Sequence, residues 1–193
     1  LQLSAKLADG TIVKGEHNIS EAGGQIEQLM IDPPDAAAHP LALEAIRNAD
    51  LIVIGPGSLY TSILPNLMVE GLTEAITAAP ANKVYVCNVA TQRGETEGYT
   101  VAAHHEALKR HTSVDLVDFV VANEHPVELG PKFFGTPVVH DGKALTHARL
   151  VLTELTSAEH PVRHDSDRLA RAIMDVYDNG SRLQSLMKSS LSN

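Results

Sequence analysis

The stretch DLIVIGPGSLYTSILPNL, residues 50–67, joins a short apolar run to a loop that contains two glycines and several hydroxyl side chains. The run 51–54 consists only of aliphatic residues, which is typical of a strand buried on both faces of a parallel sheet. In such sheets, ligands bind where loops leave the carboxyl ends of the strands. The stretch therefore predicts a buried strand that carries a polar loop to a binding site.

Outward from this stretch, apolar strands alternate with helical patterns. The expected helices span 39–49, 64–79, 99–111 and 165–180, and the expected strands after residue 36 span 50–54, 82–89, 116–123, 136–141 and 149–155. This alternation predicts an α/β, Rossmann-like fold with a mostly parallel sheet and helices on both of its faces.

Residues 1–31 are expected to form a β-rich segment instead. Alternating apolar positions flank Asp9-Gly10 and predict a hairpin, and a further strand is expected to end before Pro33. Gly180 is expected to end the last helix, so residues 1–180 are assigned to one domain and 181–193 to a polar tail. Because the chain begins inside an expected strand, we expect the domain to be incomplete.

The composition excludes several classes of protein. The net charge is −9 and no basic run is present, which argues against nucleic-acid binding. No apolar run is long enough to cross a bilayer. Cys87 is the single cysteine, so no disulfide can form within the chain. We therefore expect a cytoplasmic protein, and a homo-oligomer is left open.

The loop 55–62 is predicted to bind a phosphate or diphosphate. Its glycines let backbone amides approach a ligand, its hydroxyls can donate hydrogen bonds, and the next helix directs its N-terminus to the same place. The residues assigned to this role are Gly55, Gly57, Ser58, Thr61 and Ser62, with Tyr60 lying against a base or sugar or donating its hydroxyl. The alternative is a tight turn with helix caps, and the loop alone does not decide between the two.

A second polar loop, 87–100, follows the next buried strand. Its amide and carboxylate side chains match base edges and sugar hydroxyls, and its arginine can neutralise a phosphate. The candidate ligand-binding residues are Asn88, Gln92, Arg93, Glu95 and Thr96. The alternative is a capped loop in which Thr96 or Thr100 begins the following helix. Two such loops on adjacent strands favour a shared site.

A third candidate lies before the last helix, where Arg163 and His164 precede Asp165, a candidate helix cap. Either side chain can reach a ligand, and surface ion pairing is the alternative. A metal site is not expected, because His104 and His105 diverge on one helix and lack partners at helical metal-site spacing. Cys87 is expected to be a packed apolar residue rather than a nucleophile.

Four segments resemble one known family. GEHNIS at 15–20, IGPGSLYTSILPNL at 54–67, YVCNVATQRGETEGYT at 85–100 and VRHDSDRLARAI at 162–173 are similar to the CofD-like family, and within it to the YvcK branch of gluconeogenesis factors. The similarity extends from the first residues to about residue 173. The glycine-rich opening and acidic segment of the family are not found, so the chain resembles its C-terminal part.

The resemblance implies a Rossmann-like protein that binds UDP-sugars, notably UDP-N-acetylglucosamine, and acts in cell shape during gluconeogenic growth. No catalytic activity, metal or cofactor comes with this branch. The resemblance assigns the first two loops to the ligand and Arg163 to a ligand contact. Phe133 and Phe134 stand where the branch tends to have a ligand-binding Tyr, so a ring is kept and its hydroxyl is lost.

The other branch of the family implies an enzyme. It resembles 2-phospho-lactate transferase, which uses a guanosine nucleotide in deazaflavin cofactor synthesis and would need Mg²⁺. That branch has Asn-Pro where this chain has Leu59-Tyr60, which favours the YvcK side. A non-catalytic nucleotide-sugar binding protein is therefore the preferred interpretation, and the transferase is the alternative.

Overall fold

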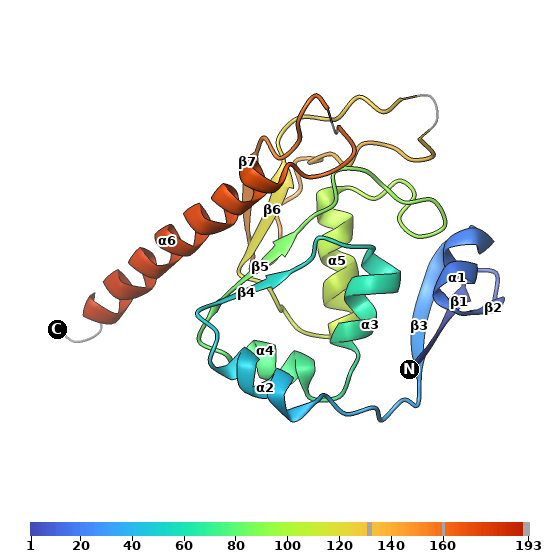
Figure 1. Ribbon diagram of the computed structural model, residues 1–193, viewed down its shortest axis with the longest axis horizontal. Coiled ribbons are helices and arrows are strands. Elements are labelled where there is room, and N and C mark those ends of the chain that lie inside the picture. The colour runs from blue at the N-terminus through green and yellow to red at the C-terminus, as the bar shows by residue number, and fades with distance from the viewer. Residues whose placement is uncertain (131–132, 160, 191–193) are drawn as a thin grey trace.

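A four-stranded parallel sheet forms the centre of the molecule. The computed structural model describes residues 1–130, 133–159 and 161–190, with side chains described as far as residue 180. The strands β4 (Leu51–Ile54), β5 (Asn82–Val86), β6 (Phe119–Asn123) and β7 (Arg149–Thr153) lie in chain order and are all parallel. This arrangement confirms the predicted α/β fold, and all four carboxyl ends meet at one edge of the sheet (Figure 1).

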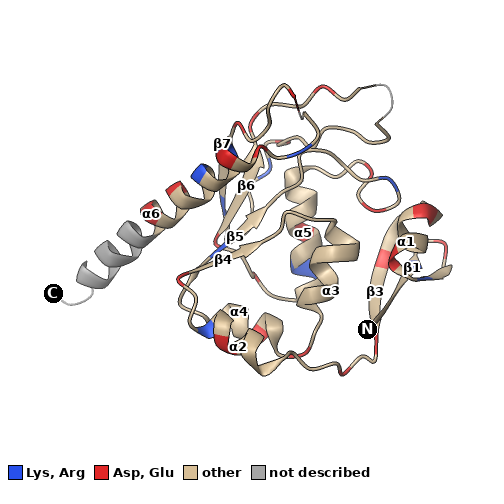
Figure 2. Cartoon of the chain, viewed as in Figure 1, with Lys and Arg blue, Asp and Glu red and all other residues tan. Residues whose placement is uncertain are grey.

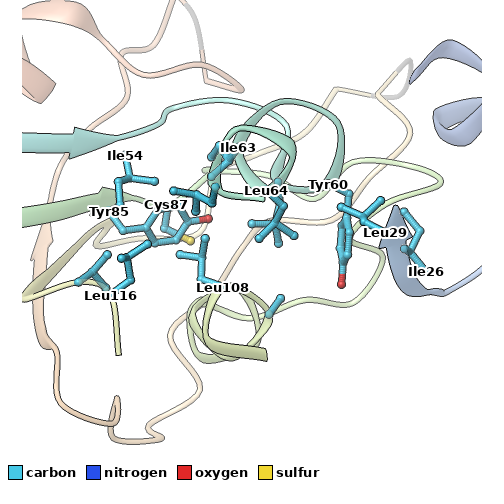
Figure 3. Packing of buried hydrophobic residues seen from close by; sticks show 14 of the residues in the cluster. Ile26, Leu29, Ile54, Tyr60, Ile63, Leu64, Tyr85, Cys87, Leu108 and Leu116 are labelled. Carbon is cyan, nitrogen blue, oxygen red and sulfur yellow. The ribbon is translucent and has the colours of Figure 1, made fainter. Parts of the chain in front are cut away.

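Helices cover both faces of this sheet. Successive side chains of a strand point to opposite faces, so these strands present apolar residues on each face that a helix can bury. Tyr85 and Cys87 pack with α3 (Leu64–Leu67) and α5 (Val101–Thr112) on one face (Figure 3). Val84 and Val121 pack on the other face against α6 (Ser166–Ser190). Cys87 is fully buried in this core, as expected for a packed apolar residue.

The N-terminal segment forms a separate antiparallel sheet of β1 (Gln2–Leu7), β2 (Ile12–Lys14) and β3 (Ile26–Asp32), in the order β2-β1-β3. The predicted turn is confirmed, since the Asp9 carboxylate accepts a hydrogen bond from the Thr11 amide and Gly10 has a φ of 88°. The helix α1 (Glu16–Ala22) was not predicted. It has one buried apolar residue, Ile19, and no capping side chain, so its sequence signal is weak.

The expected helix 64–79 is wrong as a single element. A π-helical turn, η1 (Leu59–Ile63), leads directly into α3, and a break separates α3 from α4 (Leu72–Ala78). Gly71 lies in this break with a φ of 86°, a conformation that a continuous α-helix does not contain. The helix α2 (Pro40–Arg47) forms as expected, with Pro40 in its first turn.

Two other boundaries differ from the prediction. Residues 136–141 form only an isolated bridge, Ala90 with Pro137, because proline lacks the amide that a ladder requires. The last helix does not end at Gly180 but continues to Ser190. A Cβ on Gly180 would lie 2.5 Å from Asn82 Nδ2, so this glycine permits a close approach between α6 and β5 rather than ending the helix.

The surface charge agrees with the expectation from composition. In Figure 2, Lys and Arg are scattered among several elements of the described chain, and so are the more numerous Asp and Glu residues. Among the described helices, none combines the length and the apolarity that a membrane crossing requires.

The helix α5 contains a buried histidine. Thr100 caps this helix, because its hydroxyl oxygen accepts a hydrogen bond from the Ala103 amide at 3.2 Å. Thr100 was one of the two caps that the sequence offered. His104 Nδ1 lies 2.9 Å from the Thr100 carbonyl oxygen, so the ring donates to it. The ring of Tyr99 packs edge-on against His104. Burial lowers the pKa of His104 to about 4, so the ring is neutral at neutral pH.

We expect the protein to lose stability in mild acid. The unfolded chain takes up a proton at His104 near pH 6.5, whereas the folded chain resists it until about pH 4. Stability therefore falls as the pH falls through this window, and His104 alone accounts for about 2 kcal/mol between pH 7 and pH 5. Urea unfolding at both pH values measures the difference.

The matched variants are His104→Gln and His17→Gln, the second at an exposed position on α1. The pH dependence should shrink in the first variant and stay in the second. An unchanged pH dependence in His104→Gln would contradict the assignment.

Candidate functional site

A cavity of about 760 Å³ opens at the carboxyl ends of β4 and β5. Four segments that are distant in the sequence line it: the loop after β4, the loop after β5, the two phenylalanines between β6 and β7, and the residues that precede α6. Its lining residues are Pro56, Gly57, Ser58, Asn88, Val89, Ala90, Thr91, Gln92, Arg93, Phe133, Phe134, Val162, Arg163 and His164. The first two loops therefore converge where the sequence predicted that they would.

Direct hydrogen bonds join the two loops across the cavity wall. Gln92 Nε2 donates to Ser58 Oγ at 2.7 Å, and Asn88 Nδ2 donates to Gln92 Oε1 at 3.3 Å. The side chains that follow β4 and β5 thus form one continuous polar row. This row provides the cavity with hydroxyl and amide groups in fixed positions.

The segment before α6 is tied to the same edge of the sheet. His164 Nε2 lies 3.1 Å from the Cys87 carbonyl oxygen, to which it donates. Burial lowers the pKa of His164, which keeps the ring neutral at neutral pH. This contact places the neighbouring Arg163 at the end of β5, where it lines the cavity. The predicted cap of α6 is confirmed, since Asp165 accepts from the Arg168 amide at 3.0 Å.

The cavity combines positive charge with an apolar wall. Arg93 and Arg163 line it, and no acidic side chain does so among the described residues. Phe133 and Phe134 provide aromatic surface, and the Arg93 guanidinium lies 5.6 Å from the centre of the Phe134 ring. Arginine pairs with phosphate oxygens, and aromatic rings can pack against a planar base. The arrangement suits an anionic ligand that carries a ring.

Several predicted ligand-binding residues do not reach the cavity. Tyr60 is fully buried and packs near Leu29 of β3 (Figure 3). Its hydroxyl lies 2.7 Å from that of Tyr99 and 3.1 Å from Arg110 Nη2. Tyr60 therefore does not line this cavity, and a contact between its ring and a base or sugar is not supported by its position. The turn η1 is the reason, because it rotates this side chain into the core while Ser58 stays at the cavity.

Gly55 and Ser62 also lie outside the cavity. Gly55 has a φ of 89°, and a Cβ there would approach the Val86 carbonyl oxygen to 3.2 Å, so the turn requires a glycine at this position. Ser62 lines a second, mainly apolar hollow of about 470 Å³ beside β4.

Glu95, predicted to face the ligand, is buried and holds three elements together. Its carboxylate accepts hydrogen bonds from Ser20 Oγ at 2.9 Å, Thr61 Oγ1 at 2.9 Å and the Tyr60 amide at 3.2 Å. These partners come from α1 and η1. Glu95 and Thr61 therefore act in the framework of the site and not on its surface.

Thr96 is also buried, and its role is local. Its hydroxyl oxygen accepts from the Gln92 amide at 2.9 Å, which fixes the turn that carries Gln92. The alternative in which Thr96 caps α5 is wrong, because Thr100 does so. The lining residues that the sequence did not indicate are the apolar Pro56, Val89, Ala90 and Val162, which have no distinctive chemistry, and Thr91. The Thr91 hydroxyl oxygen accepts a hydrogen bond from the Thr136 amide at 2.8 Å.

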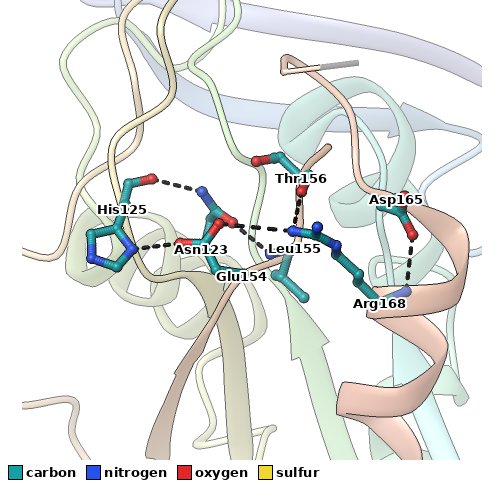
Figure 4. Close-up of polar contacts among 7 residues, drawn as sticks. All are labelled: Asn123, His125, Glu154, Leu155, Thr156, Asp165 and Arg168. Carbon is teal, nitrogen blue, oxygen red and sulfur yellow. Dashed lines mark hydrogen bonds and ion pairs between the residues drawn. The ribbon is translucent and has the colours of Figure 1, made fainter. Parts of the chain in front are cut away.

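One group of described residues has metal-binding side chains within reach of one another: Glu124, His125 and Glu154, all exposed. It lies at the carboxyl ends of β6 and β7, where Asn123 bonds to both the His125 carbonyl and the Leu155 amide (Figure 4). The hydrogen bond from His125 to Glu154 raises the pKa of the imidazole. The ion pair between His125 and Glu154 accounts for the proximity of these two side chains, and a bound metal would have to displace the proton on His125 Nδ1.

The fold is that of a Rossmann-like α/β protein, with a cavity lined by polar and arginine side chains at the carboxyl ends of its parallel strands. The family model described as 2-phospho-L-lactate transferase CofD matches residues 1–180. The chain therefore belongs to the CofD family.

Relatives with known names point to one branch of it. The gluconeogenesis factors of Halalkalibacterium halodurans and Bacillus subtilis are 41% and 40% identical to this chain over 181 and 182 residues, in each case 90% of the chain. The chain spans 56% and 57% of the length of these relatives.

A solved structure agrees with the observed fold. The crystal structure of a UPF0052 family protein from Bacillus halodurans superposes with a TM-score of 0.81 at 39% sequence identity. The superposition covers 90% of this chain and 58% of that one.

The buried carboxylate of Glu95 gives a stability prediction. The change Glu95→Gln replaces one acceptor oxygen by a donor, so at least one of its three partners must give up the hydrogen bond that it donates. We expect the free energy of unfolding to fall by about 1–2 kcal/mol, measured by urea denaturation.

The matched control is Glu21→Gln on the exposed surface of α1, which should change stability by less than about 0.5 kcal/mol. Equal effects from the two changes would show that Glu95 does not hold the site together.

Proposed function

We propose that the protein binds a nucleotide sugar of the UDP-N-acetylglucosamine type and acts as a regulatory protein in cell shape and gluconeogenic growth. The convergence of two polar loops and Arg163 around one cavity is the observation that carries this proposal. Ser58 and the arginines suit the diphosphate, and the aromatic wall suits the base. The names of the relatives support the link to gluconeogenesis. We place this function in the cytoplasm.

A transferase is the alternative, favoured by the description of the family model. Metal-dependent transfer of phosphoryl groups uses carboxylates near the phosphates. The described residues that line the cavity include no carboxylate, so these groups would have to come from outside them. Incubation with phospholactate joined to GMP through a diphosphate, a deazaflavin acceptor and Mg²⁺ tests the alternative, since transfer of phospholactate to the acceptor with release of GMP would favour the enzyme over the binding protein.

Calorimetric titration with UDP-N-acetylglucosamine tests the proposed function. Arg163→Ala should weaken binding about tenfold or more, because a hydrogen bond to a charged group is lost. The matched control is Arg171→Ala, at an exposed arginine on α6 that does not line the cavity. The absence of binding at millimolar ligand, or equal loss in both variants, would contradict the proposal.

The buried position of Tyr60 gives a separate expectation. Tyr60→Phe should leave the affinity for UDP-N-acetylglucosamine unchanged, because its hydroxyl contacts Tyr99 and Arg110 rather than the cavity. Stability should fall by about 1 kcal/mol, since those partners lose a hydrogen bond. Titration and thermal melting of the same sample separate the two effects, and a loss of affinity with unchanged stability would return Tyr60 to the ligand.

A further inference from the structure

We propose that Gln92 is a positioning residue that makes Ser58 a hydrogen-bond donor and Asn88 a hydrogen-bond acceptor toward the ligand. This inference rests on the proposed function and adds to it the pattern of hydrogen-bonding groups that the ligand must present. It follows from the direction of the two hydrogen bonds that join the loops after β4 and β5.

The direction of each bond determines what its partner can still do. Ser58 Oγ accepts from Gln92 Nε2 at 2.7 Å, so the hydroxyl proton of Ser58 is available to another acceptor. Asn88 donates through Nδ2 to Gln92 Oε1 at 3.3 Å. Among the described residues, none donates to Asn88 Oδ1, so this oxygen can accept from a ligand. One amide thus sets opposite roles on its two sides.

The backbone of Gln92 holds this amide in place. The Gln92 amide donates to Thr96 Oγ1 at 2.9 Å, and the Gln92 carbonyl accepts from the Thr96 amide at 2.9 Å. Thr96 is fully buried, so the turn that carries Gln92 is anchored in the protein interior. A reversal of the side-chain amide would require both Ser58 and Asn88 to change roles together.

The resulting pattern matches a particular chemical class. A donor at Ser58, in a cavity that also contains Arg163, suits a phosphate oxygen. An acceptor at Asn88 suits a hydroxyl or N–H group of the same ligand. A phosphorylated sugar presents both groups within a few bonds of each other, whereas inorganic diphosphate presents mainly acceptors. The site should therefore prefer a sugar-linked diphosphate to diphosphate alone.

A double-mutant cycle on binding of UDP-N-acetylglucosamine tests the relay in the full chain. Ser58→Ala and Gln92→Met should each weaken binding about tenfold, and the double variant should lose clearly less than the two single losses multiplied, because part of the effect of Gln92 runs through Ser58. Gln92→Met combined with Arg163→Ala should instead show multiplied losses. Gln25→Met, at an exposed glutamine outside the cavity, is the matched control and should bind normally.

Multiplied losses for the Ser58 and Gln92 changes, with melting temperatures near that of the unchanged protein, would overturn the inference. A merely structural role for Gln92 would lower the melting temperature without this selective coupling.

Hydrogen exchange of side-chain amides, followed by NMR without any ligand, tests the polarity separately. Exchange of one Gln92 Nε2 proton should accelerate in Ser58→Ala and stay unchanged in Asn88→Ala. Acceleration only in Asn88→Ala would mean that the amide faces the other way and would overturn the inference. Failure of the unchanged protein to bind UDP-N-acetylglucosamine would reject the proposed function, while this exchange measurement would still decide the orientation of Gln92.

Discussion

The buried carboxylate of Glu95 is the constraint on which the site depends. It accepts hydrogen bonds from α1 and from two positions of η1, and so joins the N-terminal antiparallel unit to both polar loops. The backbones of the two units approach closely at this junction. A Cβ on Gly94 would lie 2.2 Å from the Ser20 carbonyl oxygen, so only glycine permits this approach. With η1 held in this way, Tyr60 enters the core and Ser58 remains at the cavity.

The electrostatics of the cavity contrast with those of the whole chain. The protein has a net charge of −9, yet Arg93 and Arg163 line a cavity that contains no acidic side chain among the described residues. The acidic chain thus concentrates positive charge at the carboxyl ends of β4 and β5. Such a local field attracts an anion while overall repulsion disfavours nucleic acid.

The sequence predicted those features that depend on composition and pattern. The strand at 51–54 was predicted correctly, because an aliphatic run limits the local structure strongly, whereas the second half of the expected loop 55–62 forms the helical turn η1. The direction of individual side chains was not predictable: Tyr60 and Glu95 are polar residues in the expected loops, but the π-helical turn and the contact with α1 turn them inward. The end of the last helix was predicted wrongly at Gly180. This glycine allows close packing on Asn82, a tertiary contact that the sequence pattern does not reveal.

The proposed binding mode places the diphosphate of a nucleotide sugar between the loops after β4 and β5. Diffraction from crystals of this protein soaked with UDP-N-acetylglucosamine tests it most directly. We expect density for the diphosphate within hydrogen-bonding distance of Ser58 Oγ and the Arg163 guanidinium, with the base near Phe133. Density for the nucleotide at another surface, with the cavity left empty in the same crystals, would contradict it.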